Sequence, residues 1–162
     1  MEKLWYQKQL RILQTVLREK DLIQYDVDGV VAYMKKVEAN CLVVNAGGVI
    51  DFFPNTMELS RPNQFMGKQD ILGELTKKCH SNHIHVIVRV DFRGVEKERY
   101  ERRPDWFGMN PDGSPLTGWN ETIYRPCYTS YYGKEYAQEY VQRLMTTYDV
   151  DGIWENCVVF GY

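Results

Sequence analysis

Residues 84–92 read Ile-His-Val-Ile-Val-Arg-Val-Asp-Phe, a short apolar run in which valine occupies every second position from 86 to 90. Successive side chains of a β-strand point to opposite faces, so the three valines share one face. The other face carries His85, Ile87, Arg89 and Asp91. An all-valine face predicts packing against helices, which leaves Arg89 and Asp91 at the carboxyl end of the opposite face.

Three further runs predict strands, at residues 11–17, 41–45 and 152–157. The first is ambiguous because it continues a helix-like stretch, and short apolar runs cannot be assigned by periodicity alone. Helices are predicted between the strands from apolar stripes at 26–38, 69–80 and 131–147. The order β-α-β-α-β-α-β predicts an α/β fold with a parallel sheet and helical crossovers.

Two connections are much longer than the others, and both follow the carboxyl end of a predicted strand. They run over residues 46–68 and 93–130, whereas the helix-to-strand links at 39–40 and 149–151 are short. In parallel α/β folds the binding loops grow at the carboxyl ends of the strands. We therefore expect the functional site at this edge of the sheet.

Composition is that of an ordinary globular protein: 162 residues, 44% hydrophobic and 26% charged, with a net charge of −2. The charge argues against a nucleic-acid partner, because phosphate binding needs a concentrated basic face. The four cysteines form no Cys-x-x-Cys pair, so no disulfide framework is expected. There is no signal-peptide pattern and no apolar run of membrane-spanning length. The expectation is a cytoplasmic protein without a membrane partner.

All three histidines fall in the segment Cys79-His80-x-x-His83-x-His85. This segment lies where the second predicted helix ends and the third strand begins, at the end of the sheet opposite the long connections. Its spacing matches no common zinc pattern. We expect neither a metal ion nor a cofactor.

Five strings stand in order along the chain: RILQTVLREKD (11–21), VVNAGGVIDFFP (43–54), VIVRVDF (86–92), RRPDWFGMNPDGSP (102–115) and YDVDGIWEN (148–156). Together they resemble a group of TIM-barrel proteins described as hypothetical glycoside hydrolases. The group is more distantly similar to α-L-fucosidases and to barrels that carry a β-galactosidase-type trimerisation domain. The resemblance implies that the four strands are strands one to four of a (β/α)8 barrel. Because a complete barrel needs roughly 250 residues, residues 1–162 would form a partial domain of four βα units.

The resemblance makes the strand ends the candidate site. Asp91 and Glu155 are candidate catalytic carboxyl groups, because glycosidases use a pair of them. Asn45 and Arg89 are candidate sugar-binding residues, since an amide offers both a donor and an acceptor to a hydroxyl group. A structural Arg89–Asp91 pair and a turn-forming role for Asn45 are the alternatives.

At strand four, the α-L-fucosidases place a nucleophilic aspartate near a position that aligns with Asn156. An amide cannot serve as a carboxylate nucleophile. Either Glu155 takes that role, or this position binds substrate and Asn156 contacts the sugar. Strand alternation turns only one of the two side chains toward the barrel interior, and the sequence leaves open which.

The connection at 93–130 is rich in aromatic residues, which stack on sugar faces in many binding sites. Trp106 and Trp119 are the candidates for substrate contact, and the alternative for each is packing within the loop.

These observations predict a glycoside hydrolase half-barrel that is inactive on its own, because a second catalytic carboxyl group would come from strands outside the chain. The alternative is a non-catalytic carbohydrate-binding half-barrel. In either case strands one and four would be open edges, through which two copies could pair.

Overall fold

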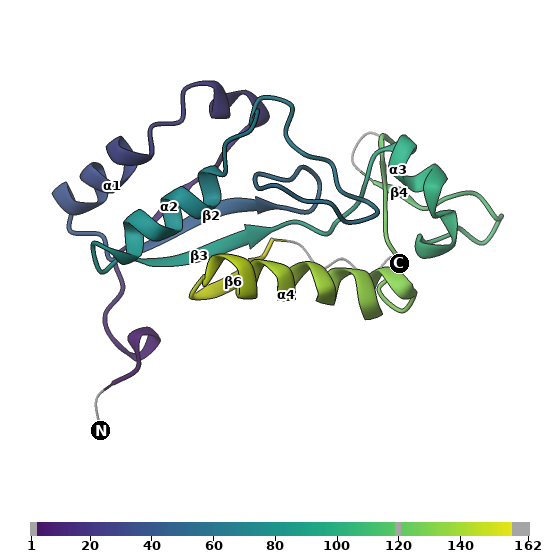
Figure 1. Ribbon diagram of the computed structural model, residues 1–162. Coiled ribbons are helices and arrows are strands. Elements are labelled where there is room, and N and C mark those ends of the chain that lie inside the picture. Colours follow the sequence, from purple (N-terminus) through teal and green to yellow (C-terminus); the bar gives the residue numbers. More distant parts are fainter. Residues whose placement is uncertain (1–2, 119–120, 157–162) are drawn as a thin grey trace.

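The computed structural model describes residues 3–118 and 121–156 (Figure 1). Its main sheet is parallel throughout, with the strand order β1-β2-β3-β6. The strands are β1 (Ile12–Thr15), β2 (Cys41–Gly47), β3 (His85–Val90) and β6 (Gly152–Glu155). Since the order in the sheet follows the order in the chain, each crossover adds the next strand on the same side. The predicted α/β class and all four predicted strands are confirmed, although β1 is shorter than residues 11–17.

Three helices make the crossovers: α1 (Val27–Lys36), α2 (Ile71–His80) and α4 (Ala137–Tyr148). Aspartates cap the first two, because Asp26 accepts a hydrogen bond from the Gly29 N–H (2.9 Å) and Asp70 accepts one from the Gly73 N–H (3.0 Å). The predicted helix at 131–147 begins as a π-helical turn, η4 (Tyr132–Tyr136), and continues as α4. Helix α1 packs beside α2, and α2 beside α4.

The helices cover one face of the sheet and leave the other open. Val86, Val88 and Val90 are fully buried in the helix-facing core, as the sequence predicted. The opposite side chains of β3 are only half-buried. At the two edges of the open face, Ile12, Val16 and Trp154 are 52%, 63% and 47% exposed. A sheet with one covered face and one open face is what four βα units of a barrel present when no further strands close the ring.

The second long connection contains local structure that the sequence did not predict. Residues 93–130 form α3 (Lys97–Arg102), the 3-10 turn η3 (Pro104–Trp106) and a short hairpin of β4 (Thr117–Gly118) and β5 (Ile123–Tyr124). Two more 3-10 turns, η1 (Trp5–Gln7) and η2 (Glu19–Ile23), flank β1. Within the described residues, every helix is too short or too polar to cross a bilayer.

Candidate active site at the strand ends

A cavity of about 500 Å³ opens at the carboxyl ends of β1, β2 and β3. Its polar lining comes from all three strand ends, and the walls are completed by aliphatic and aromatic side chains of the loops. The polar residues are Arg18, Glu19, Asn45, Arg89, Asp91 and Arg93, and the apolar ones include Val49, Ile50, Phe52 and Ile123. The cavity lies at the edge of the sheet where the long connections predicted a site.

Asp91 is the centre of the polar network. Its Oδ1 accepts a hydrogen bond from Arg93 Nε (2.8 Å), and its Oδ2 accepts from Arg93 Nη2 (2.5 Å). Oδ2 also accepts from Asn156 Nδ2 (2.9 Å) and lies 3.9 Å from Arg89 Nη2. The Asp91 side chain is 11% exposed. Both carboxylate oxygens therefore accept hydrogen bonds from the loop after β3, Oδ2 also accepts one from the residue after β6, and Arg89 of β3 lies at ion-pair distance.

Arg89 and the two asparagines extend this network across the sheet. Arg89 Nε donates to Asn156 Oδ1 (3.1 Å), so Asn156 accepts from one partner and donates to the other. The Asn45 amide oxygen faces the Leu17 N–H (3.3 Å), and with the amide turned over the oxygen accepts from Arg89 Nη1 at 3.3 Å. Four of the predicted site residues thus come together: Asn45, Arg89, Asp91 and Asn156.

Glu155 does not join them, which corrects the expectation that it pairs with Asp91. In the parallel register Glu155 lies opposite Val90, and parallel partners point to the same face. That face is the one covered by helices, where Glu155 lines a hollow with Ala137 and Val141 of α4. Its Oε1 accepts from the Phe92 N–H (3.3 Å). The register therefore turns Asn156 toward the open face and Glu155 away from it.

The same register reveals a residue that sequence reasoning missed. Trp154 lies opposite Arg89 on the open face, and the residue is 47% exposed. The signal was present in the sequence, since Trp154 and Asn156 are two residues apart at the end of the predicted strand 152–157. The sequence alone did not show which side chains of β6 point to the open face, so this spacing could not be used.

The two tryptophans proposed from the aromatic loop have different outcomes. Trp106 is 1% exposed and stacks on Tyr131, with the two ring centroids 4.8 Å apart. The Arg103 guanidinium lies 4.1 Å from the centroid of the Trp106 ring. Its ring is part of the core, so the prediction that it contacts substrate is corrected. Trp119 lies outside the described residues, and its role stays a prediction.

Buried polar groups hold the β2 loop that forms one wall of the cavity. Gly48 has a φ of 106°, and a Cβ there would lie 2.2 Å from the Asp91 backbone oxygen, so this position requires glycine. The Gly48 N–H donates to the Tyr140 hydroxyl (3.1 Å), which itself donates to Asp51 Oδ1 (2.5 Å). Burial raises the pKa of Asp51, against the lowering effect of this hydrogen bond. The arrangement fixes the loop against β3 and α4.

Arg99 provides a second anchor for the same loop. Its guanidinium is almost fully buried and donates to the backbone oxygens of Gly48 (3.1 Å), Val49 (2.6 Å) and Leu59 (2.9 Å). Glu96 Oε2 accepts from Arg99 Nε at 2.8 Å. Arg99 is therefore a structural residue of the loop.

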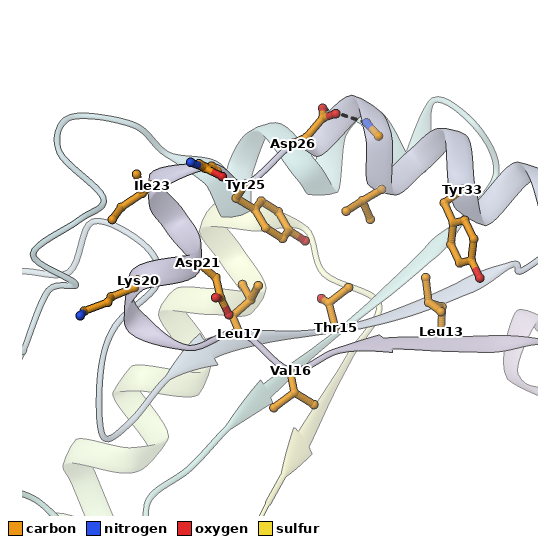
Figure 2. Close-up of a pocket in the computed structure, with 13 residues that line it drawn as sticks. Leu13, Thr15, Val16, Leu17, Lys20, Asp21, Ile23, Tyr25, Asp26 and Tyr33 are labelled. Atoms are coloured by element: carbon orange, nitrogen blue, oxygen red, sulfur yellow. Dashed lines mark hydrogen bonds between the residues drawn. The ribbon is translucent and has the colours of Figure 1, made fainter.

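A larger hollow of about 770 Å³ lies elsewhere, between β1, η2 and α1 (Figure 2). Leu13, Leu17, Tyr25 and Tyr33 line it, and Figure 2 shows Lys20 and Asp21 at one end of the group. It borders the open edge of the sheet and includes neither Asn45 nor the Asp91 network. We therefore regard this hollow as a feature of the uncovered β1 edge and not as part of the candidate active site.

The histidine segment forms a polar cluster at the other end of the strands. Asp151 accepts from the Val86 N–H and lies 2.8 Å from both His80 Nε2 and His85 Nδ1. Burial opposes ionisation of Asp151, but these hydrogen bonds outweigh it and hold the pKa of Asp151 below its ordinary value. Among the described residues, no group of three histidine, cysteine, aspartate or glutamate side chains is placed to hold a metal ion. The cluster joins the end of α2 to β3 and β6.

A parallel sheet with one open face and a polar cavity at the carboxyl ends of its strands is the arrangement of a partial (β/α) barrel. Residues 24–157 match the family model described as Hypothetical glycosyl hydrolase 6, and the chain belongs to that family. No curated protein sequence matches the chain.

Solved structures with the same fold include glycoside hydrolases. An alpha-L-fucosidase isoenzyme 2 from Paenibacillus thiaminolyticus matches with a TM-score of 0.72 and 16% identity over 94% of this chain and 24% of its own. A noncanonic maltogenic alpha-amylase from Thermotoga neapolitana matches with a TM-score of 0.69 and 14% identity, over 94% of this chain and 40% of its own. A hypothetical protein from Ruminiclostridium thermocellum matches with a TM-score of 0.66 and 16% identity, over 93% of this chain and 77% of its own. The chain spans less than half of the two hydrolases.

Proposed function

We propose that this chain forms part of a glycoside hydrolase, in which the cavity at the strand ends binds the sugar. The observation that carries the proposal is the convergence of Asn45, Arg89, Asp91 and Asn156 from three neighbouring strands. Carboxylate, amide and guanidinium groups together supply the donors and acceptors that sugar hydroxyls require. The family and the fold neighbours support the same class of substrate.

Among the described residues, two carboxyl groups line the cavity, those of Asp91 and Glu19, and Glu19 lies 3.6 Å from Arg61. Both oxygens of Asp91 already accept hydrogen bonds, and Asn156 stands where a second carboxylate would be useful. Glycosidases need two carboxyl groups about 5–10 Å apart across the bond that breaks. We propose that Asp91 binds or stabilises the sugar, and that at least one catalytic carboxyl group comes from outside this chain. Residues 1–162 are accordingly proposed to be one domain of four βα units.

The presence of Asn156 favours a second candidate, carbohydrate binding without turnover. In this reading the half-barrel pairs with another copy of itself, because β1 and β6 are the outer strands of the sheet in the described part of the chain and carry exposed apolar side chains on the open face. Light scattering tests the pairing: a dimer at micromolar concentration supports it, and a folded monomer at all concentrations excludes it.

The test of the sugar site is an NMR titration of the chain with a panel of methyl and aryl glycosides, alongside an assay for release of the aryl group. We expect binding that shifts the signals of Asn45 and Asn156 without release of the aryl group. Asp91→Asn should weaken this binding about tenfold, whereas Asp28→Asn, at an 81% exposed side chain on α1, should leave it unchanged. Binding by none of the glycosides would refute the proposal.

A further inference from the structure

The cavity has more positive than negative side chains. Among the described residues, Arg18, Arg89 and Arg93 line it together with Glu19 and Asp91, and these three cations and two anions have a formal charge of +1. Glu19 also lies 3.6 Å from Arg61, which is not part of the lining. Asp91 is then the carboxylate that faces the cations at the end of β3.

Arg18 is the cation with no such partner. Asp91 is within 4 Å of both Arg89 and Arg93. Arg18, by contrast, forms no ion pair among the described residues and has an exposed side chain. The backbone of Arg18 is held at the start of η2, because its N–H donates to Asp21 Oδ2 (2.6 Å). The rim of the cavity at β1 therefore presents an uncompensated guanidinium.

From this arrangement we infer that the sugar bound here carries a carboxylate, as a uronic acid does. The inference rests on the proposed function and specifies its substrate class. A guanidinium binds a carboxylate through two parallel hydrogen bonds, which matches one planar group to the other. The carboxylate of the ligand would lie against Arg18. The ring hydroxyls would face Asn45, and the ring itself would lie along the apolar wall of Val49, Ile50 and Phe52.

The test compares glucuronate, glucose and inorganic sulfate as ligands of the full chain, by NMR titration at low salt and at 0.5 M sodium chloride. We expect glucuronate to bind at least tenfold more tightly than glucose, with the preference reduced at high salt. Arg18→Gln should lower glucuronate binding about tenfold, and Arg18→Lys should restore part of it because the charge is kept without the planar fork. Arg143→Gln is the matched control, since Arg143 lies on α4 and is paired with Glu139.

The possible outcomes separate this inference from the proposed function. Equal binding of glucuronate and glucose, unaffected by Arg18→Gln, would overturn the inference and leave the sugar site intact. Sulfate binding as tightly as glucuronate, with no response to glucose, would identify a simple anion site and overturn both. Binding of none of the three would overturn the inference, and the titration with methyl and aryl glycosides would then decide the proposed function separately.

Discussion

Asn156 donates through Nδ2 to Asp91 Oδ2 at 2.9 Å, although the two residues are 65 positions apart in the sequence. The contact joins the ends of β3 and β6 on the open face of the sheet. Asn156 also accepts from Arg89, so its amide uses one donor and its acceptor within the same network. Asn156 thus places a neutral amide at a position where a second carboxylate would repel the carboxylate of Asp91.

Asn156→Asp tests this relationship. The new carboxylate would keep the bond from Arg89 but face Asp91 without a proton between them, and like charges at that distance disfavour joint ionisation. We expect a loss of about 1–3 kcal/mol in the free energy of unfolding at pH 7, measured by urea denaturation. Asn156→Ala, which removes the bonds without adding charge, should lose less stability than Asn156→Asp.

Trp154 and Trp106 should respond in opposite ways to substitution. Trp106→Ala empties a core position and should destabilise the fold by about 3–5 kcal/mol. Trp154→Ala alters an exposed ring and should cost less than about 1 kcal/mol. If Trp154 stacks on the sugar, its replacement should weaken glycoside binding while the midpoint of urea unfolding stays nearly constant. Unchanged glycoside binding by Trp154→Ala would show that the ring is not a sugar contact.

Tyr140→Phe removes the hydroxyl that bridges the Gly48 N–H and Asp51. Since both partners are buried, we expect a loss of about 2 kcal/mol in the free energy of unfolding. The pKa of Asp51 is already raised by burial, so its ionisation in the folded state reduces stability as the pH rises through that pKa. Without the hydrogen bond from Tyr140, which lowers the pKa of Asp51, this loss of stability with rising pH should be larger.

The loss caused by Tyr140→Phe should therefore be larger at pH 8 than at pH 5, as measured by urea unfolding. Tyr33→Phe, at an exposed position on α1, is the control. A pH-independent loss would indicate that Asp51 does not ionise through this range.

Asp151→Asn tests the polar cluster at the opposite end of the strands. The pKa of Asp151 is lowered in the folded state, so its ionised form stabilises the fold above the ordinary pKa near 4. That contribution is lost as the pH falls through the folded-state value. The free energy of unfolding, measured by urea denaturation, should be about 1–2 kcal/mol larger for the wild type than for Asp151→Asn at pH 6. This difference should shrink as the pH is lowered from 4 toward 3. A constant difference from pH 6 to pH 3 would contradict this account.

The sequence predicted the class of fold because it depends on local patterns. The alternation in residues 84–92 predicted the buried valine face, and the lengths of the connections predicted a site at the carboxyl edge, where the structure has a polar cavity. It also supplied Asn45, Arg89, Asp91 and Asn156, which are strand-end residues. The hairpin and α3 in the second long connection were missed, because they are held by contacts between distant segments and not by local periodicity.

What the sequence determined by itself is therefore the parallel β/α order, the face of β3 that packs on helices and the set of polar strand-end residues. The tertiary structure decided which of those residues meet. The register of β6 against β3, with Val90 opposite Glu155, turned Asn156 toward Asp91 and Glu155 toward α4. Packing of the long loop placed Trp106 in the core. Register and packing arise from contacts between residues far apart in the chain, and a local pattern of residue types does not contain them.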